Sequence, residues 1–166
     1  KYLKNNYNEN SLIFLPYLNY GGSISPFVNL NSKAEIFGIL PHHNNFDIMT
    51  SCYEGLALSI KDCYGAKINR KDNLYLAGGA SKSKILPQLI SNALNVKVKI
   101  LTNSELGALG ISFLIDNYLN KTNLKNLIND HQKVGHIYTP NKKHSKYLNN
   151  KYQKYKKLRE SLENIW

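Results

Sequence analysis

One stretch sets the architecture of this protein: residues 74–94, with the sequence LYLAGGASKSKILPQLISNAL. Its apolar start, Leu74 to Ala77, predicts a short strand, and Gly78 to Ser81 predicts a tight turn. Pro87 is tolerated only near the first turn of a helix, so we expect a helix to begin around Ser83 or Lys84. Its apolar stripe is Ile85, Leu86, Leu89, Ile90, Ala93 and Leu94.

The residues that follow predict a second strand and a second helix. Val96 to Leu101 alternates apolar residues with lysine, as a strand does. Thr102 or Ser104 is then expected to cap a helix that carries Leu106, Leu109, Phe113 and Leu114. Strand, helix, strand and helix in close succession indicate a parallel pair of strands with a right-handed crossover. The sequence therefore predicts an α/β fold.

Upstream of this unit, the sequence predicts two strands and a helix. Ser11 to Leu15 is a short apolar run that ends at a proline, and Glu35 to Ile39 is a second candidate strand. From Asp47 onward, apolar residues recur every three or four positions until Gly65. This pattern predicts an amphipathic helix with an acidic first turn and a glycine stop.

The carboxy-terminal part of the chain predicts one long helix. A weakly periodic segment around Leu124 to Ile128 comes first, and a loop is expected from there to Pro140. The helix that follows has one broad apolar face: Tyr147, Leu148, Tyr152, Tyr155, Leu158, Leu162 and Ile165. No repeat or low-complexity linker interrupts the 166 residues, so we expect a single domain over residues 1–166.

Composition narrows the classes of partner. No run approaches the roughly 20 apolar residues that a membrane span needs, and the chain from Lys1 onward lacks a secretory signal pattern. We therefore expect no membrane partner. Cys52 and Cys63 have no histidine or cysteine at metal-ligand spacing. They are expected to be buried reduced thiols, which is typical of a cytoplasmic protein.

The formal net charge of +11 raises the possibility of a nucleic-acid partner. Nearly all of the positive residues are lysine, whereas readers of bases and phosphates favour the arginine fork. The abundance of Lys, Asn, Ile and Tyr is typical of drift toward AT-rich codons, so we expect no nucleic-acid partner. The basic stretch from Lys142 to Arg159 is interpreted as a solvated helix face. A basic nucleic-acid-binding module remains the alternative.

A strand that leads through Gly-Gly onto a helix is a sensible anion or nucleotide site, because glycine lets a ligand approach the backbone. Ser81 and Ser83 are candidates for additional hydroxyl contacts. Many α/β crossovers use such a turn for packing alone, and the stretch completes neither a P-loop nor a dinucleotide fingerprint. His42 and His43 lack a third metal ligand nearby, and the helical Glu54 is interpreted as a structural hydrogen-bonding group.

Taken in order, several blocks of the chain resemble the carboxy-terminal domain of the FGGY carbohydrate kinases. The resemblance covers almost the whole chain. The blocks are Phe14-Leu15-Pro16-Tyr17-Leu18, Gly22-Ser23-Ile24-Ser25-Pro26, Phe37-Gly38-Ile39, Tyr53-Glu54-Gly55-Leu56-Ala57, Ala77-Gly78-Gly79-Ala80-Ser81-Lys82-Ser83, Glu105-Leu106-Gly107-Ala108-Leu109-Gly110 and Tyr138-Thr139-Pro140.

The resemblance implies an actin-like ATPase domain of the ribonuclease H type, forming the carboxy-terminal half of a two-domain sugar kinase. It also implies transfer of the ATP γ-phosphoryl group to a sugar hydroxyl, with magnesium. By position in the family, the loop that binds ATP corresponds to Gly78, Gly79, Ala80, Ser81 and Ser83. The loop near the interdomain cleft corresponds to Gly22 to Pro26, with Gly22 and Ser25 as its candidate site residues.

Departures from the family pattern bear on the substrate. Ser23 and Ile24 replace a charged pair that members commonly carry, and Asn29 and Lys33 replace an acid and an arginine. The branch of L-xylulose kinases is similar in lacking the charged pair. The resemblance therefore favours a pentulose such as xylulose as the sugar substrate.

The resemblance also implies what this chain does not supply. The catalytic aspartate and most sugar contacts of the family belong to an amino-terminal domain upstream, so no catalytic residue and no metal ligand is assigned here. We expect the isolated chain to be inactive, to expose an apolar surface that meets the missing domain, and to be capable of forming a homodimer. A degenerate kinase-like domain with a regulatory or interaction role is a further alternative.

Overall fold

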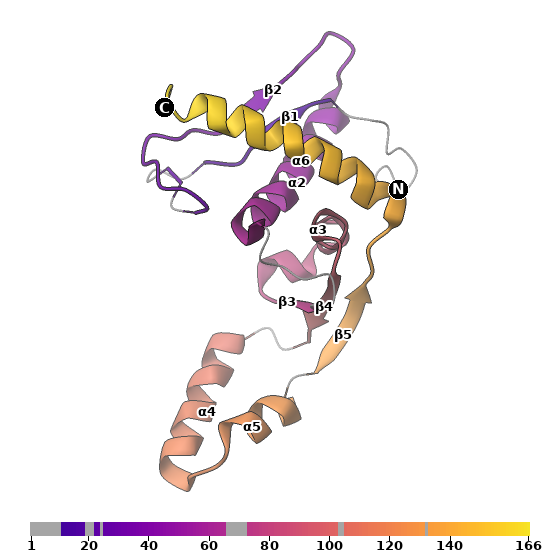
Figure 1. Ribbon diagram of the computed structural model, residues 1–166. Coiled ribbons are helices and arrows are strands. Elements are labelled where there is room, and N and C mark those ends of the chain that lie inside the picture. Colours follow the sequence, from indigo (N-terminus) through magenta and orange to yellow (C-terminus); the bar gives the residue numbers. More distant parts are fainter. Residues whose placement is uncertain (1–10, 19–21, 24, 66–72, 103–104, 132) are drawn as a thin grey trace.

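The computed structural model describes residues 11–18, 22–23, 25–65, 73–102, 105–131 and 133–166. Two small sheets lie on either side of a helical layer, and the carboxy-terminal helix runs along the outside (Figure 1). The core lies where α2, α3 and α6 meet β1 and β4. Its fully buried apolar side chains include Leu15, Leu58, Leu89, Ile90, Val98, Leu148 and Tyr155.

The first sheet and its covering helix form as the sequence predicts. Strand β1 (Ile13–Leu15) pairs antiparallel with β2 (Glu35–Phe37), and α2 (Asn45–Tyr64) packs on β1. Helix α2 begins two residues before the predicted start, because Asn44 caps it in a reciprocal capping box with Asp47. It ends at Gly65, whose φ of 54° lies in the left-handed region that glycine tolerates.

The predicted parallel unit is confirmed. Strand β3 (Asn73–Leu76) pairs parallel with β4 (Lys97–Leu101), and α3 (Leu86–Leu94) connects them. The expected loop before Pro140 is wrong, because β5 (Val134–Tyr138) pairs antiparallel with β4. Most β5 residues are exposed, so its sequence lacks the apolar alternation that marks a half-buried strand.

The predicted start of α3 is also wrong. A short 3₁₀ helix, η2 (Gly79–Lys82), follows β3, and Ser83 returns to extended backbone before α3 begins at Leu86. The Ser83 hydroxyl oxygen accepts hydrogen bonds from the backbone amides of Ile85 (3.3 Å) and Leu86 (3.1 Å). Ser83 therefore holds the start of α3 from outside the helix, while Pro87 occupies its first turn as expected.

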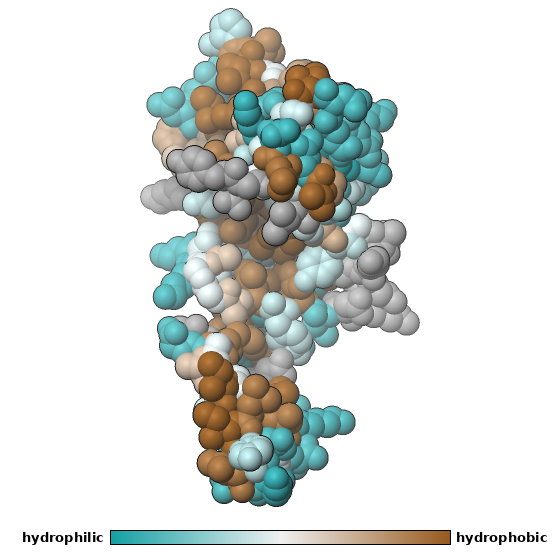
Figure 2. Space-filling model, turned by 90° about the vertical axis from the view of Figure 1, so that its left-hand side faces the viewer, coloured by the Kyte–Doolittle hydropathy of each residue, from teal (hydrophilic) through white to brown (hydrophobic). Residues whose placement is uncertain are grey.

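Helices α4 (Leu106–Asn120) and α5 (Leu124–His131) pack on each other and project beyond the second sheet (Figure 1). The predicted cap by Thr102 is wrong: its hydroxyl donates to the Lys133 carbonyl, and Glu105 precedes α4 without a side-chain cap of its own. Ser104 lies outside the described residues. No residue of α4 is buried, and apolar side chains gather at the lower end of the molecule in Figure 2.

The terminal helix α6 (Lys142–Leu162) confirms the long helix but corrects its interpretation as a solvated basic face. Lys151 and Arg159 are buried, while six lysines of the stretch are exposed: Lys142, Lys143, Lys146, Lys154, Lys156 and Lys157. The expected burial of both thiols is wrong as well. Both cysteines are free, but Cys52 is half-buried and Cys63 is exposed.

Candidate functional site

The Gly-Gly turn lies at the carboxyl end of β3 and is open to solvent. Gly78 has a φ of 72°, a conformation that side chains disfavour, and Gly79 begins η2. A Cβ atom added at either glycine would meet no atom within 4 Å. The glycines are therefore not required here for internal packing, and their backbone is accessible to a ligand.

Hydroxyl groups hold this turn in shape. The Ser81 hydroxyl donates to the Gly78 carbonyl at 2.7 Å, and the Ser81 amide donates to the same oxygen at 3.2 Å. The Ser83 amide donates to the Ala80 carbonyl at 3.3 Å. The structure therefore brings all five predicted residues, Gly78 to Ser81 and Ser83, into one turn, where both serines already have structural hydrogen bonds.

The late start of α3 changes which groups can supply positive charge at the Gly-Gly turn. Because α3 begins only at Leu86, Gly78 and Gly79 do not belong to its first turn, where the helix dipole and free amides act most strongly. Positive charge at the turn comes instead from Lys82 and Lys84, which are both exposed. Lys82 was not among the predicted site residues, although it lies between Ser81 and Ser83 in the same turn.

The predicted cleft loop lies elsewhere, after β1. Gly22 has a φ of 61°, and a Cβ atom there would lie 2.2 Å from the Asn29 carbonyl oxygen, so close backbone packing requires glycine. The amide of Ser23 donates to the same Asn29 oxygen at 2.9 Å. Ser25 is exposed, and its hydroxyl donates to Cys63 Sγ in α2 at 3.5 Å. Gly22 thus has a packing role, whereas Ser25 is accessible; Ile24 lies outside the described residues.

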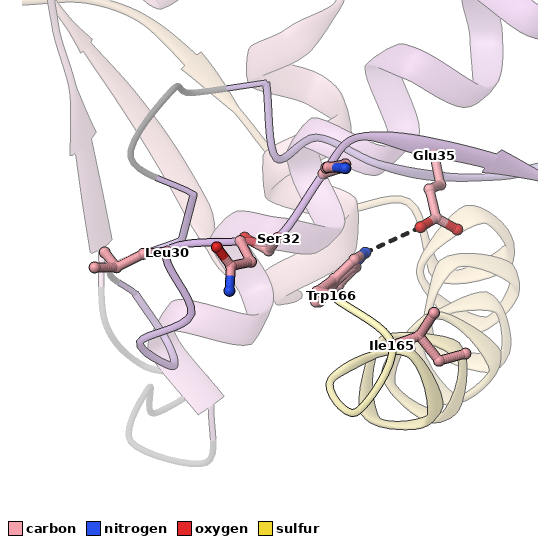
Figure 3. Close-up of a pocket in the computed structure, with 7 residues that line it drawn as sticks. Leu30, Ser32, Glu35, Ile165 and Trp166 are labelled. Carbon is pink, nitrogen blue, oxygen red and sulfur yellow. Dashed lines mark hydrogen bonds between the residues drawn. The ribbon is translucent and has the colours of Figure 1, made fainter.

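A hollow of about 630 Å³ opens beside the segment that follows this loop (Figure 3). The Trp166 indole donates from Nε1 to Glu35 Oε1 at 3.0 Å across one side of it. Its other lining residues are Leu30, Asn31, Ser32, Lys33 and Ile165. This hollow does not include the Gly-Gly turn, and the sequence analysis did not anticipate the role of Trp166.

Glu54 forms a buried ion pair between α2 and α6. Its Oε2 lies 2.5 Å from Lys151 Nζ, and the Tyr147 hydroxyl donates to the same oxygen at 3.4 Å. Burial raises the pKa of Glu54 and lowers the pKa of Lys151. The interpretation of Glu54 as a structural hydrogen-bonding group is confirmed.

His43 also has a local structural role, since its Nδ1 accepts a hydrogen bond from the Leu40 amide at 2.8 Å. Within the described ranges, no three His, Cys, Asp or Glu side chains come together as a metal site would need. We therefore assign no residue to magnesium. Among the described helices, none is both long and apolar enough to cross a membrane.

Comparison with known proteins gives one family. The family model described as "FGGY family of carbohydrate kinases, C-terminal domain" matches residues 4–114, which include both loops. Erythritol kinase of Brucella abortus is 32% identical over 104 residues, or 63% of this chain and 20% of that protein. The probable L-xylulose kinase of Haemophilus influenzae is 26% identical over 160 residues, or 95% of this chain and 31% of that protein.

A solved structure gives the same result for the fold. The ligand-bound xylulose kinase from Lactobacillus acidophilus superposes with a TM-score of 0.82 at 24% identity. The match covers 93% of this chain and 32% of that one. The present chain thus spans about a third or less of the length of these three proteins.

Proposed function

This chain belongs to the FGGY family of carbohydrate kinases, and we propose that it is the carboxy-terminal, nucleotide-binding domain of a kinase that phosphorylates a pentulose such as xylulose. Its fold is that of the FGGY sugar kinases, an actin-like ATPase domain of the ribonuclease H type. The observation that carries the proposal is the open Gly78–Gly79 turn inside the matched region.

The choice of a pentulose is supported by the extent of similarity. The probable L-xylulose kinase aligns over 95% of this chain, whereas erythritol kinase aligns over 63%. A ketose and a polyol both present hydroxyl groups that can accept a phosphoryl group, so the second candidate acceptor is a tetritol. Xylulose and erythritol assayed side by side on the full-length kinase would separate the two.

The role of this domain in the reaction is to bind and orient ATP. The backbone at Gly78 and Gly79 is accessible, and the Ser81–Gly78 hydrogen bond stabilises the turn that presents it. Phosphoryl transfer depends on holding both substrates in register and on balancing charge, with magnesium on the phosphates. We expect the catalytic base and the sugar contacts to come from an amino-terminal domain, so the isolated chain should not turn over.

A degenerate, regulatory kinase-like domain is the second candidate. The observation that favours it is the loss of the charged pair from the cleft loop, where the uncharged residues Ser23 and Ile24 now stand. Such a domain would retain the fold without the nucleotide site. Nucleotide binding therefore separates the two candidates.

The first test is calorimetric titration of ATP and of ADP, with magnesium, into the 166-residue chain and its Gly79→Asp variant. A Cβ atom at Gly79 meets nothing within 4 Å, so the aspartate fits without displacing the turn. Its charge repels phosphate, and we expect at least a tenfold loss of affinity. Ser112→Asp, on the exposed surface of α4, is the charge-matched control and should bind as the unmodified chain does.

Equal binding by the Gly79→Asp variant would contradict the proposed nucleotide site. Absence of binding by the unmodified chain would favour the degenerate candidate. The same preparation should show no sugar phosphorylation, and measurable turnover would overturn the proposal that the catalytic base lies outside this chain.

A further inference from the structure

Lys82 lies on the same face of η2 as Gly79. In a 3₁₀ helix, the side chains at positions i and i+3 eclipse one another along the axis. Gly79 is the first residue of η2 and Lys82 is the last, so they form such a pair. The Lys82 side chain therefore projects from the same face of η2 as Gly79, which has no side chain there.

That face is open, and the Lys82 charge on it has no acidic partner in the part of the chain that the structure describes. A Cβ atom at Gly79 would meet no atom within 4 Å, and Lys82 is exposed. Among the described residues, no carboxylate forms an ion pair with Lys82. An anionic group that approaches the Gly79 backbone would thus meet a free ammonium group.

Lys84 is a nearby lysine with which Lys82 can be compared. It follows Ser83, whose φ of −69° and ψ of 134° take the chain out of the 3₁₀ helix. Lys84 is equally exposed, but it does not share the i, i+3 relation with Gly79. The two lysines carry the same charge two positions apart in the sequence, and only Lys82 follows Gly79 by three residues within η2.

We propose that Lys82 binds the phosphate oxygens of the nucleotide held at the Gly78–Gly79 turn, and thereby makes this turn favour nucleotides over nucleosides. The proposal rests on the proposed function and adds a binding residue to it. A lysine ammonium group is a compact charge on a flexible stem, suited to following a phosphate whose position changes between substrate and product. Hydrogen bonds between charged partners are about twice as strong as neutral ones.

The test is calorimetric titration of ATP and of adenosine into three forms of the 166-residue chain: unmodified, Lys82→Met and Lys84→Met. Both substitutions keep side-chain length and remove one exposed charge, so thermal unfolding should be unchanged. We expect Lys82→Met to lower affinity for ATP about tenfold and to leave affinity for adenosine unchanged. Lys84→Met should shift ATP affinity by less than about twofold.

The possible outcomes separate this inference from the proposed function. If ATP affinity falls equally in both variants, or in neither, the assignment of Lys82 is overturned while the nucleotide site stands. If Lys82→Met weakens adenosine as much as ATP, the residue shapes the turn and does not bind phosphate, which also overturns the assignment. If the unmodified chain binds neither ligand, the nucleotide site itself fails, and the assignment fails with it.

Discussion

At the scale of single residues, the most consequential finding is the buried ion pair between Lys151 and Glu54. Lys151 and Glu54 are only 5% and 1% exposed, and Glu54 Oε1 has no hydrogen-bond partner among the described residues. Removing both ions from water is costly, and their mutual attraction offsets that cost only while both partners are present. The pair therefore fixes how α6 lies on α2 more than it adds net stability.

Substitutions in the Glu54–Lys151 pair should change stability in a strongly non-additive way. Lys151→Met leaves the Glu54 carboxylate buried and unpaired, and should lower the free energy of unfolding by about 3–5 kcal/mol. The double variant Glu54→Leu/Lys151→Met removes both charges and should lose markedly less than Lys151→Met alone. Urea denaturation of the unmodified chain, both single variants and the double variant measures the coupling. A simple sum of the two single effects would contradict the argument.

The sign of the pH dependence follows from the same burial. Burial raises the pKa of Glu54 above its ordinary value of 4.5, so the folded protein binds this proton more tightly than the unfolded chain does. Stability from such a group is present at low pH and is lost as the pH rises through the folded pKa. In Lys151→Met the opposing lysine is gone, so the Glu54 contribution should fall more steeply above pH 4.5 than in the unmodified chain.

At the scale of secondary-structure elements, glycine decides how closely α2 meets β1. A Cβ atom at Gly55 would lie 2.4 Å from the Phe14 carbonyl oxygen, which is backbone and cannot move aside cheaply. Gly110 is also helical, in α4, but a Cβ atom there would meet nothing within 4 Å. The two glycines therefore serve different purposes despite their similar place in a helix.

We expect Gly55→Ala to destabilise the chain by about 1–3 kcal/mol, because α2 must shift away from β1. Gly110→Ala should raise stability by up to about 1 kcal/mol, through the higher helix propensity of alanine. Denaturant titration of both variants checks the contrast. A Gly55→Ala variant as stable as the unmodified chain would show that α2 and β1 can separate without cost.

Local sequence patterns predicted the elements that have a clear apolar periodicity and missed those that do not. The β3–α3–β4 unit was predictable because its apolar spacing changes clearly from strand to helix. Strand β5 was not, since it is defined by pairing with β4 and not by an apolar face of its own. The start of α3 was misplaced because Ser83 caps it by side-chain hydrogen bonds while standing outside it. In the candidate site, the glycine turn was predictable from the sequence. That Lys82 lies on the same face as Gly79 became known only from the 3₁₀ helix in the structure.

At the scale of the whole molecule, the exposed apolar face of α4 is the clearest sign of a missing contact. Ile111 and Leu114 are each 61% exposed and Tyr118 is 74% exposed, and Figure 2 shows apolar atoms over this end of the molecule. Contiguous apolar surface of this kind is usually covered by another protein surface. We expect α4 to provide the apolar surface that the isolated chain offers to another protein surface.

The isolated chain should therefore self-associate through α4. The double variant Ile111→Glu/Leu114→Glu should shift the chain toward monomer in sedimentation velocity and lower its binding of an apolar dye. Its unfolding temperature should stay nearly constant, because neither side chain is buried. Ser112→Glu adds charge beside the apolar residues and serves as the control. A chain that is already monomeric and binds no dye would contradict this role for α4.

Helices α4 and α5 lie in the chain between two strands that pair with each other. The polypeptide leaves the second sheet at Leu101 and returns at Val134, and these two residues pair with each other across adjacent strands. The whole helical arm is thus topologically an insertion at one hairpin, entered and left through neighbouring points. Insertions or deletions in this arm beyond Leu114, where the family match ends, need neither cut the sheet nor move the Gly78–Gly79 turn. A change in the length of this arm therefore leaves the β3–β4 pairing and the Gly78–Gly79 turn in place.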